Sequence, residues 1–428
     1  MKTFELNKLS KKEIQSLSKR PAIDFSKAFS VVKPMLEEIK QNGLPAALGY
    51  AKQFDNFSDE NILVGEDEFS SAEKNLSTEV KTAIITAANN IRTFHEKQIP
   101  KVYEVETMPG VKCSREFRAI ENVGLYIPGG SAILPSTMLM LGIPASIAGC
   151  KRVVACSPTK EGKVNDALLF AAKFCGVKEF YKLGGAQAIA VMAYGCEEIK
   201  KVDKLFGPGN QFVTAAKLLV SINVDGCAID MPAGPSEVLV VADNTANPSF
   251  VASDLLSQAE HGVDSQVVLL TFTQSFTDSV LVEVEKQLNN LPRKEIASQS
   301  LKNSFVLICD TLDEALSFSN TYAPEHLILH LVNAESYKDK ISNAGSVFLG
   351  EYSPESAGDY ASGTNHSLPT YGYAKSFGGV SVESFMKSVT FQHLTKEGLT
   401  GLAPAIETLA EVEKLSAHKN AVIIRLKQ

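Results

Sequence analysis

Short apolar segments alternate with glycine-rich turns and helical patterns throughout residues 123–222, and this alternation limits the possible folds more than any other feature. The expected strands are Val123–Ile127, Arg152–Cys156, Glu179–Leu183 and Val202–Phe206. The expected helices are Thr137–Ala148, Asn165–Cys175, Gln187–Tyr194 and Asn210–Ile222. One strand and one helix together take about 25–30 residues, which is typical of a parallel, doubly wound sheet.

The same alternation returns after residue 235. The expected strands are Glu237–Val241, Gln266–Thr273, Ser304–Cys309, His326–Leu331 and Ser346–Leu349. The expected helices are Pro248–His261, Thr277–Leu288 and Leu312–Thr321. Two such blocks predict two α/β domains, and the segment Ala228–Pro235 is a plausible connection between them.

The remaining regions have helical patterns. Residues 1–25 predict one short polar helix, which has too little apolar surface to stand alone. Residues 26–118 predict mostly helix, at Ser26–Ile39, Leu44–Phe54 and Ser71–Glu96. Residues 384–418 predict a helical tail with apolar residues every three or four positions, and residues 420–428 predict a strand. The apolar stripe of the tail indicates docking onto another domain or subunit.

Composition narrows the class of protein. The chain has 428 residues and a net charge of −7, and 44% of its residues are hydrophobic, so it can bury a large core. The mild acidity argues against nucleic acid as the main partner. The N-terminus lacks the pattern of a secretory signal, and no apolar run approaches the ~20 residues of a membrane span. Seven scattered cysteines without a CxxC motif favour reduced thiols. We therefore expect a cytoplasmic protein with no membrane and no nucleic-acid partner.

Three glycine-rich loops follow expected strands, at residues 128–132, 184–188 and 207–210. In open α/β sheets ligands bind beyond the carboxyl ends of the strands, and backbone N–H groups there can hold a phosphate. The G-x-G-x-x-G motif is absent. The loops therefore either share an anionic ligand or only make tight turns between strand and helix.

Two polar pairs could carry chemistry. Gln258 and His261 are three residues apart, so on a helix they share one face and could share a metal ion. The alternative is a helix end at which His261 caps carbonyl groups. Glu325 and His326 offer two proton acceptors of different pKa. Neighbours on an extended segment point to opposite sides, so both could face a substrate only if the turn at Pro324 breaks that alternation.

The last third of the chain adds further polar candidates. Asp359 and His366 lie in a segment rich in glycine and serine that either lines a site or is a solvated loop. Glu413 and His418 lie near the end of the tail helix, where His418 could instead complement the helix dipole. Together Gln258, His261, Asp359 and His418 form a mixed nitrogen and oxygen set that suits Zn²⁺ or a similar ion.

Eight segments of the chain strongly resemble the histidinol dehydrogenases, in the order of that family. They are GLYIPGGSA (124–132), KLGGAQAIA (182–190), FGPGN (206–210), MPAGPSEVLVVAD (231–243), DLLSQAEHG (254–262), PEHL (324–327), SAGDYASGTNH (356–366) and SAHKNAV (416–422). The resemblance covers essentially the whole chain and implies the activity of that family. This is the oxidation of L-histidinol, through a tightly held aldehyde, to L-histidine with two NAD⁺, the last step of histidine biosynthesis.

The resemblance also implies an architecture. It implies a homodimer with shared active sites and two related, incomplete Rossmann-like domains, one inserted in the other, with small helical terminal segments. The corresponding boundaries are residues 1–23 for the N-terminal segment, 24–125 with 236–380 for the first α/β domain, 126–235 for the second, NAD-binding domain, and 381–428 for a dimerisation tail.

Roles for single residues follow from the same resemblance. It implies Zn²⁺ ligands at Gln258, His261, Asp359 and His418, with His418 from the partner subunit. It implies a general base at His326 and a water-activating carboxylate at Glu325. It implies that Ser236, His366 and Glu413 contact the substrate together with these residues, and that Tyr126, Gln187 and Asn210 contact NAD⁺.

Three alternatives stay open on the sequence alone. In an aldehyde dehydrogenase of the thiol type, a cysteine such as Cys113 or Cys150 would attack the aldehyde, although small buried cysteines are common. A protein that only binds zinc or a nucleotide would not need the pair Glu325 and His326. Finally, the metal ligands could hold a purely structural ion.

Overall fold

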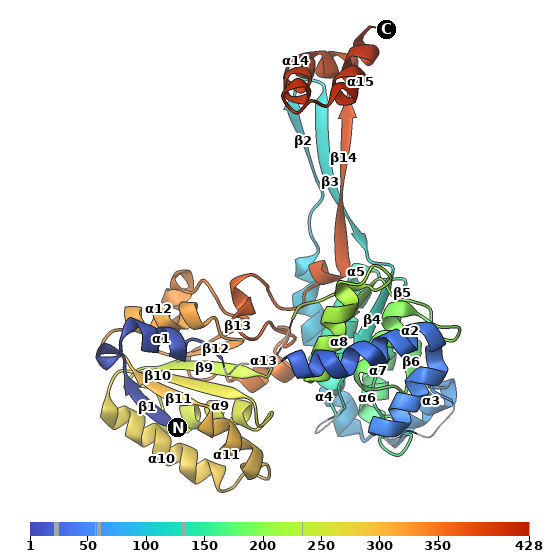
Figure 1. Ribbon diagram of the computed structural model, residues 1–428. Helices are drawn as coiled ribbons and strands as arrows, with labels where there is room; N and C mark the ends of the chain where they lie inside the picture. Colours follow the sequence, from blue (N-terminus) through green and yellow to red (C-terminus); the bar gives the residue numbers. More distant parts are fainter. Residues whose placement is uncertain (21–24, 56, 58–60, 130–132, 233, 428) are drawn as a thin grey trace.

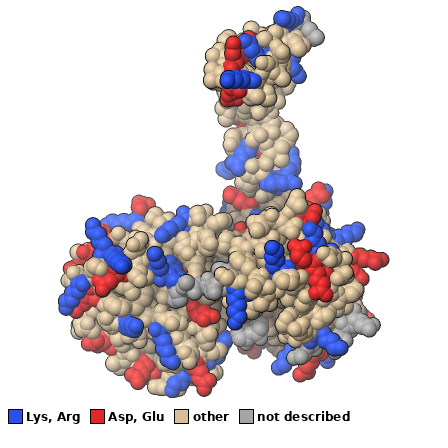
Figure 2. Space-filling model, viewed as in Figure 1, with Lys and Arg blue, Asp and Glu red and all other residues tan. Residues whose placement is uncertain are grey.

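The computed structural model describes residues 1–20, 25–55, 57, 61–129, 133–232 and 234–427. The chain forms two lobes, each built on a parallel sheet, and an arm that projects away from both lobes (Figure 1). On the face seen in Figure 2, basic and acidic side chains are interspersed over both lobes. Among the described residues, no helix is long and apolar enough to cross a membrane.

The first lobe contains a five-stranded sheet with the order β6-β5-β4-β7-β8. Its strands are β4 (Asn122–Tyr126), β5 (Arg152–Cys156), β6 (Glu179–Tyr181), β7 (Lys204–Phe206) and β8 (Ala228–Ile229). Its crossover helices are α5 (Pro135–Ala148), α6 (Asp166–Phe174), α7 (Gly185–Tyr194) and α8 (Gln211–Ser221). All strand pairs are parallel, and the apolar strands are covered by helices on both faces.

The second lobe contains a six-stranded parallel sheet with the order β1-β11-β10-β9-β12-β13. Its strands are β1 (Lys2–Glu5), β9 (Glu237–Ala242), β10 (Gln266–Thr271), β11 (Phe305–Ile308), β12 (His326–His330) and β13 (Ser346–Leu349). Its helices are α9 (Pro248–Ala259), α10 (Gln274–Leu288), α11 (Lys294–Lys302) and α12 (Leu312–Tyr322). Numbered along the chain, β4–β8 and β9–β13 share the order 3-2-1-4-5. The predicted α/β fold with two related Rossmann-like sheets is confirmed.

The N-terminal segment differs from the single helix predicted over residues 1–25. Lys2–Glu5 form strand β1, which pairs in parallel with β11, and the Phe4 ring packs edge-on against Phe305 with 6.3 Å between the centroids. A short helix, α1 (Lys11–Leu17), follows behind a capping box formed by Ser10 and Glu13. The prediction was wrong for β1 because the sheet edge supplies hydrogen-bond partners that the local sequence does not reveal.

Three helices precede the first sheet, namely α2 (Phe25–Asp55), α3 (Glu66–Asn75) and α4 (Thr78–His95). Gly43, with φ of 61°, kinks α2, and Ser77 caps α4 and divides the helix predicted over Ser71–Glu96. The family resemblance implied one domain made of residues 24–125 and 236–380. In the structure these helices instead pack against α5, α6, α7 and α8 of the five-stranded sheet.

The arm consists of an antiparallel sheet with a helical tip. Its strands are β2 (Tyr103–Met108), β3 (Val111–Ala119) and β14 (Met386–Leu394), and its tip is formed by α14 (Lys396–Val412) and α15 (Ser416–Leu426). The helical tail predicted over residues 384–418 is wrong for β14, and the prediction of mostly helix over residues 26–118 does not hold for β2 and β3. The strand predicted at the C-terminus is wrong for α15. Strands β2 and β14 are largely exposed, so the arm buries little apolar surface that a local pattern could reveal, and β14 pairs with β3, a strand far away in the chain.

The smaller elements complete the description. One short α-helix, α13 (Glu355–Tyr360), follows β13 and carries part of the candidate site. The 3-10 helices are Leu6–Lys8, Glu96–Gln98, Ala334–Lys340, Tyr373–Lys375 and Val382–Phe385.

Candidate functional site

The candidate site lies at the amino edge of the six-stranded sheet. Glu237 begins β9 and His326 begins β12, and these two strands are neighbours. A crossover helix runs antiparallel to its strand, so α9 ends at this same edge and brings Gln258 and His261 to it. Three segments that are far apart in the sequence therefore meet at one edge.

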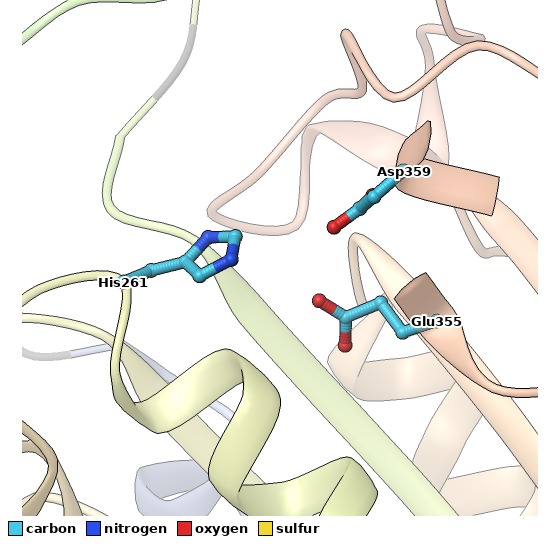
Figure 3. A group of neighbouring side chains, drawn as sticks. All are labelled: His261, Glu355 and Asp359. Atoms are coloured by element: carbon cyan, nitrogen blue, oxygen red, sulfur yellow. The ribbon is translucent and has the colours of Figure 1, made fainter. Parts of the chain in front are cut away.

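A group of possible metal ligands stands at this edge. His261, Glu355 and Asp359 each offer one ligand atom, all within 4.8 Å of one another, and Figure 3 shows their side chains pointing toward a common space. His261 is exposed, whereas the two acids are buried. The protein packed around its ring nevertheless lowers the pKa of His261 by desolvation, which favours the neutral form that binds metal ions.

Glu355 was not predicted from the sequence. It lies four residues before Asp359, so the two carboxylates share one face of α13. That spacing was the available signal. Burial raises the pKa of Glu355 well above its ordinary value; the charge of His326 opposes this shift, and the neighbouring acids add to it.

Gln258 is fully buried beside Glu355. With its amide nitrogen turned toward Glu355, it donates to both carboxylate oxygens, and its oxygen accepts from the backbone N–H of Glu237 at 3.3 Å. With the amide turned over, the side-chain oxygen of Gln258 faces the carboxylate of Glu355, and a cation between them would be bound by both groups. Because Glu325, Glu355 and Asp359 are also buried here, the chemistry of the donor set fits a divalent cation.

The pair Glu325 and His326 is held by the backbone of a single residue, Glu237. The Glu237 N–H donates to Oε2 of Glu325 at 2.9 Å, and Nδ1 of His326 lies 3.3 Å from the Glu237 carbonyl oxygen. Ala323 adopts a left-handed conformation, with φ of 53°, immediately before Pro324. This turn brings both side chains to one strand end, so that Oε2 of Glu325 lies 3.7 Å from Nδ1 of His326.

Both groups of this pair have perturbed pKa values. Burial raises the pKa of Glu325 to about 8. Burial alone would lower the pKa of His326, but the charges of Glu355, Glu325 and Asp359 outweigh it and raise the pKa to about 10. Nε2 of His326 is buried, lies 3.5 Å from Oδ1 of Asp359 and has no hydrogen-bond partner among the described residues. The acids around His326 therefore favour its protonated ring, and a divalent cation held by the same acids would offset their charge and favour the neutral ring.

His366 and Ser236 border the same space. Nδ1 of His366 lies 2.8 Å from the carbonyl oxygen of Asp359, and its Nε2 lies 3.0 Å from Oγ1 of Thr137 on α5. Asn365 donates to the carbonyl oxygen of Met140 on the same helix at 2.6 Å. Ser236 is half-buried directly before Glu237. The segment 359–366 thus connects the amino edge of one sheet to the helix that follows β4 of the other.

Glu413 and His418 are not brought to this edge within one chain. Glu413 ends α14 and His418 lies in α15, and both residues are exposed at the tip of the arm (Figure 1). Of the nine residues predicted to bind the metal or the substrate, the structure brings seven to this edge and leaves two apart. The seven are Ser236, Gln258, His261, Glu325, His326, Asp359 and His366.

The predicted NAD⁺ residues lie at the carboxyl edge of the five-stranded sheet. The hydroxyl of Tyr126 accepts from the backbone N–H of Gly185 at 3.1 Å. Gln187 donates to Oδ2 of Asp55 at 2.7 Å. Oδ1 of Asn210 accepts from the backbone N–H groups of Phe212 and Val213 at 3.0 and 3.1 Å, which caps α8. Residues 130–132 of the first glycine-rich loop lie outside the described residues.

A buried ion pair that was not predicted supports the third of these loops. Nζ of Lys217 lies 2.5 Å from Asp230 and donates to the carbonyl oxygen of Gly207 at 2.7 Å. The Gly207 N–H donates to the same aspartate at 2.8 Å. Gly207 has φ of 125°, and a Cβ atom there would lie 2.0 Å from the carbonyl oxygen of Tyr126. The loops after β4 and β7 therefore touch where a glycine is required.

The two cysteines considered for thiol catalysis do not belong to this group. Cys113 lies in β3 of the arm, and Cys150 follows α5 with its Sγ 3.9 Å from the carbonyl oxygen of Phe385. Burial raises the pKa of Cys150 to about 11, which opposes formation of the nucleophilic thiolate.

Comparison with known proteins connects this geometry to a family. The family model described as histidinol dehydrogenase matches residues 18–426. The chain belongs to the histidinol dehydrogenase family. The resemblance predicted from the sequence motifs is thereby confirmed.

Two members of the family illustrate the similarity. The chain is 52% identical to a histidinol dehydrogenase from Yersinia pestis, over 97% of this chain and 94% of the relative. A crystal structure of histidinol dehydrogenase from Elizabethkingia anophelis has 52% identity and a TM-score of 0.95, and the match covers 100% of this chain and 98% of that one. The family consists of NAD-dependent oxidoreductases of histidine biosynthesis.

Proposed function

We propose that this protein oxidises L-histidinol through L-histidinal to L-histidine with two NAD⁺ and zinc, as the last step of histidine biosynthesis in the cytoplasm. One observation carries the proposal. Glu325 and His326 are fixed side by side on the Glu237 backbone, next to the ligand atoms of His261, Glu355 and Asp359.

His326 acts as the general base for the alcohol in its neutral form, which a cation bound by the neighbouring acids would favour by offsetting their charge. Its Nδ1 faces the Glu237 carbonyl oxygen, so the proton of a neutral ring resides on Nδ1 and Nε2 is left as the acceptor. Nε2 is buried and without a hydrogen-bond partner among the described residues, so it can take the hydroxyl proton of a substrate placed beside it. The same nitrogen serves again in the second oxidation.

Glu325 acts in the second oxidation, which requires water to add to the aldehyde. Its carboxyl group accepts one hydrogen bond, from the Glu237 N–H, which leaves further lone pairs for a water molecule. Because burial raises the pKa of this group to about 8, it can both take a proton from water and return one near neutral pH.

Zinc fits the donor set of Gln258, His261 and Asp359, with His418 contributed by a second copy of the chain. When bound, Zn²⁺ supplies a Lewis acid that orients the imidazole and amino groups of histidinol. Ser236 and His366, with Glu413 of the second copy, complete the contacts to the substrate.

NAD⁺ fits the carboxyl edge of the five-stranded sheet. Tyr126, Gln187 and Asn210 lie in or beside the loops after β4, β6 and β7, where helices α7 and α8 begin. Helix N-termini favour anions such as the pyrophosphate. When bound, NAD⁺ accepts the hydride.

The test is the yield of NADH from L-histidinol and NAD⁺, before and after chelation and after Zn²⁺ is returned. We expect two NADH per histidinol, loss of the reaction on chelation and recovery with zinc. If folded, zinc-loaded protein formed no NADH, the protein would either oxidise a different alcohol or bind its ligands without catalysing a reaction. If chelation also unfolded the protein, the ion would be structural.

The homodimer with shared sites has its own support and its own test. The arm exposes apolar side chains, including Val105, Val389 and Phe391, which a second copy would cover. We expect that mixing Gln258→Ala protein with His418→Ala protein restores about a quarter of the wild-type activity, because half of the dimers are hybrids with one intact site. If subunits are shown to exchange and no activity returns, each chain completes its own site and the shared-site proposal fails.

A further inference from the structure

Arg20 and Glu237 form a buried ion pair directly behind the catalytic pair. Nε and Nη2 of Arg20 each donate to one carboxylate oxygen of Glu237, both at 2.6 Å. The two side chains are only 5% and 1% exposed. A two-pronged contact of this kind fixes the direction of both groups as well as their separation.

Arg20 also holds the turn that leads into the catalytic pair. Its guanidinium group lies 3.5 Å from the centroid of the Tyr322 ring and donates to the Tyr322 carbonyl oxygen. It donates to the Ala323 carbonyl oxygen at 3.0 Å as well. Ala323 is the left-handed residue that ends α12, two positions before Glu325.

These contacts close a ring of interactions. One side of the ring runs from Arg20 through the α12–β12 turn to Glu325 and His326. The other side runs from Arg20 through the Glu237 carboxylate to the Glu237 backbone, which contacts both catalytic side chains. A shift of Arg20 therefore changes the separation of β9 and the turn, and with it the direction of both catalytic groups.

We propose that the Arg20–Glu237 ion pair is a positioning device that aims Glu325 and His326 at the substrate. The proposal rests on the catalytic roles proposed above for Glu325 and His326. Neither Arg20 nor Glu237 has a role among the predicted site residues. The pair also connects the N-terminal segment to the amino edge of the six-stranded sheet, and no sequence pattern indicates this contact.

The experiment compares two double variants of the full-length, zinc-loaded protein. Arg20→Met with Glu237→Met removes both charges together, since removing one would leave the other buried and unpaired. The control is Arg152→Met with Glu179→Met, because Arg152 also makes a two-pronged contact with Glu179, at 2.9 and 2.7 Å, on β5 and β6 of the other sheet. Zinc content, thermal unfolding, kcat and KM are measured for each variant.

The proposal predicts that the Arg20/Glu237 variant keeps its zinc and both KM values. It also predicts that kcat falls about 10- to 100-fold with histidinol and with histidinal alike, since a displacement of catalytic groups by about 1 Å has effects of this size. The control variant keeps wild-type kcat. Wild-type kcat in the Arg20/Glu237 variant, or an equal loss in the control, would overturn the proposal.

Arg20→Lys decides the matter if the double variant does not fold. Lysine keeps the positive charge beside Glu237 but cannot also reach the two carbonyl oxygens as a planar fork does. A reduced kcat at unchanged KM supports the positioning role, and wild-type kcat refutes it. Wild-type protein in the same assay reports on the proposed function itself, so failure of that function is distinguished from failure of the ion-pair proposal.

Discussion

In the five-stranded sheet the predicted NAD⁺ residues follow the carboxyl ends of β4, β6 and β7, whereas in the six-stranded sheet Glu325 and His326 stand at the amino end of β12. The two sheets share the strand order 3-2-1-4-5 when their strands are numbered along the chain. The candidate residues lie beside strands 1, 3 and 4 of the five-stranded sheet and beside strands 1 and 4 of the six-stranded sheet. One sheet therefore presents its carboxyl edge and the other its amino edge.

Helix direction explains why the two edges suit different ligands. At the carboxyl edge of the five-stranded sheet, α7 and α8 begin, and their free N–H groups favour anions. At the amino edge of the six-stranded sheet, α9 ends, and its free carbonyl groups join buried acids such as Glu355 and Asp359. Carbonyl groups and carboxylates favour cations. Duplicated topology can thus supply a nucleotide site and a metal site in one molecule.

His326→Asn should reduce turnover more than the other changes, because it removes the proposed base from the amino edge of the six-stranded sheet. We expect kcat to fall about 10²- to 10⁴-fold with both histidinol and histidinal, as loss of a general base commonly does. Zinc should remain bound, because its proposed ligands are unchanged.

The matched control for that change is His393→Asn, an exposed histidine on β14 of the arm. Steady-state kinetics with each substrate and metal analysis check both variants. Normal turnover by His326→Asn would show that the amino edge of the six-stranded sheet does not take part in the reaction.

Glu325→Gln should have a smaller and more selective effect. The alcohol step should continue while the oxidation of histidinal falls by about 10²-fold, because the amide cannot take a proton from water. Rapid-quench analysis should then show histidinal accumulating on the enzyme. If this variant oxidised histidinal at the wild-type rate, the assignment of the two steps would be wrong.

The smallest expected effect comes from a pair of asparagine caps. Asn210 caps α8 at the predicted NAD⁺ edge, and Asn247 caps α9 by accepting from the Ser249 N–H at 2.9 Å, at the unused carboxyl edge of the other sheet. Each change to alanine should cost ~1 kcal/mol of unfolding free energy.

Only Asn210→Ala should also raise the KM for NAD⁺, about fivefold for a loss of ~1 kcal/mol of binding. Thermal unfolding and NAD⁺ titrations compare the two variants. An equal rise in KM in Asn247→Ala would break the distinction between the two edges.

Most of the parallel sheets could be predicted because their signal is local. Arg152–Cys156 and Ser346–Leu349 were predicted with the residues that the structure shows. Glu325 and His326 are adjacent in the sequence, so their pairing needed only the turn at Ala323.

The other elements and site residues depend on contacts between segments far apart in the sequence, which no local pattern reveals. Strands β2 and β14 are largely exposed, and the β-branched run in α15 reads as a strand until Val422 is seen buried at the arm tip. Arg20 is one arginine in a polar segment, and only the fold places it beside Glu237. Glu355 could have been found from its spacing to Asp359, but not its contact with Gln258.

The most direct test is a crystal structure of the protein with L-histidinol, NAD⁺ and Zn²⁺. We expect histidinol beside His261, Asp359 and His326 at the amino edge of the six-stranded sheet. We expect the nucleotide on the loops after β4, β6 and β7. A nucleotide bound at the carboxyl ends of β9 and β12, or histidinol bound away from His326, would contradict these expectations.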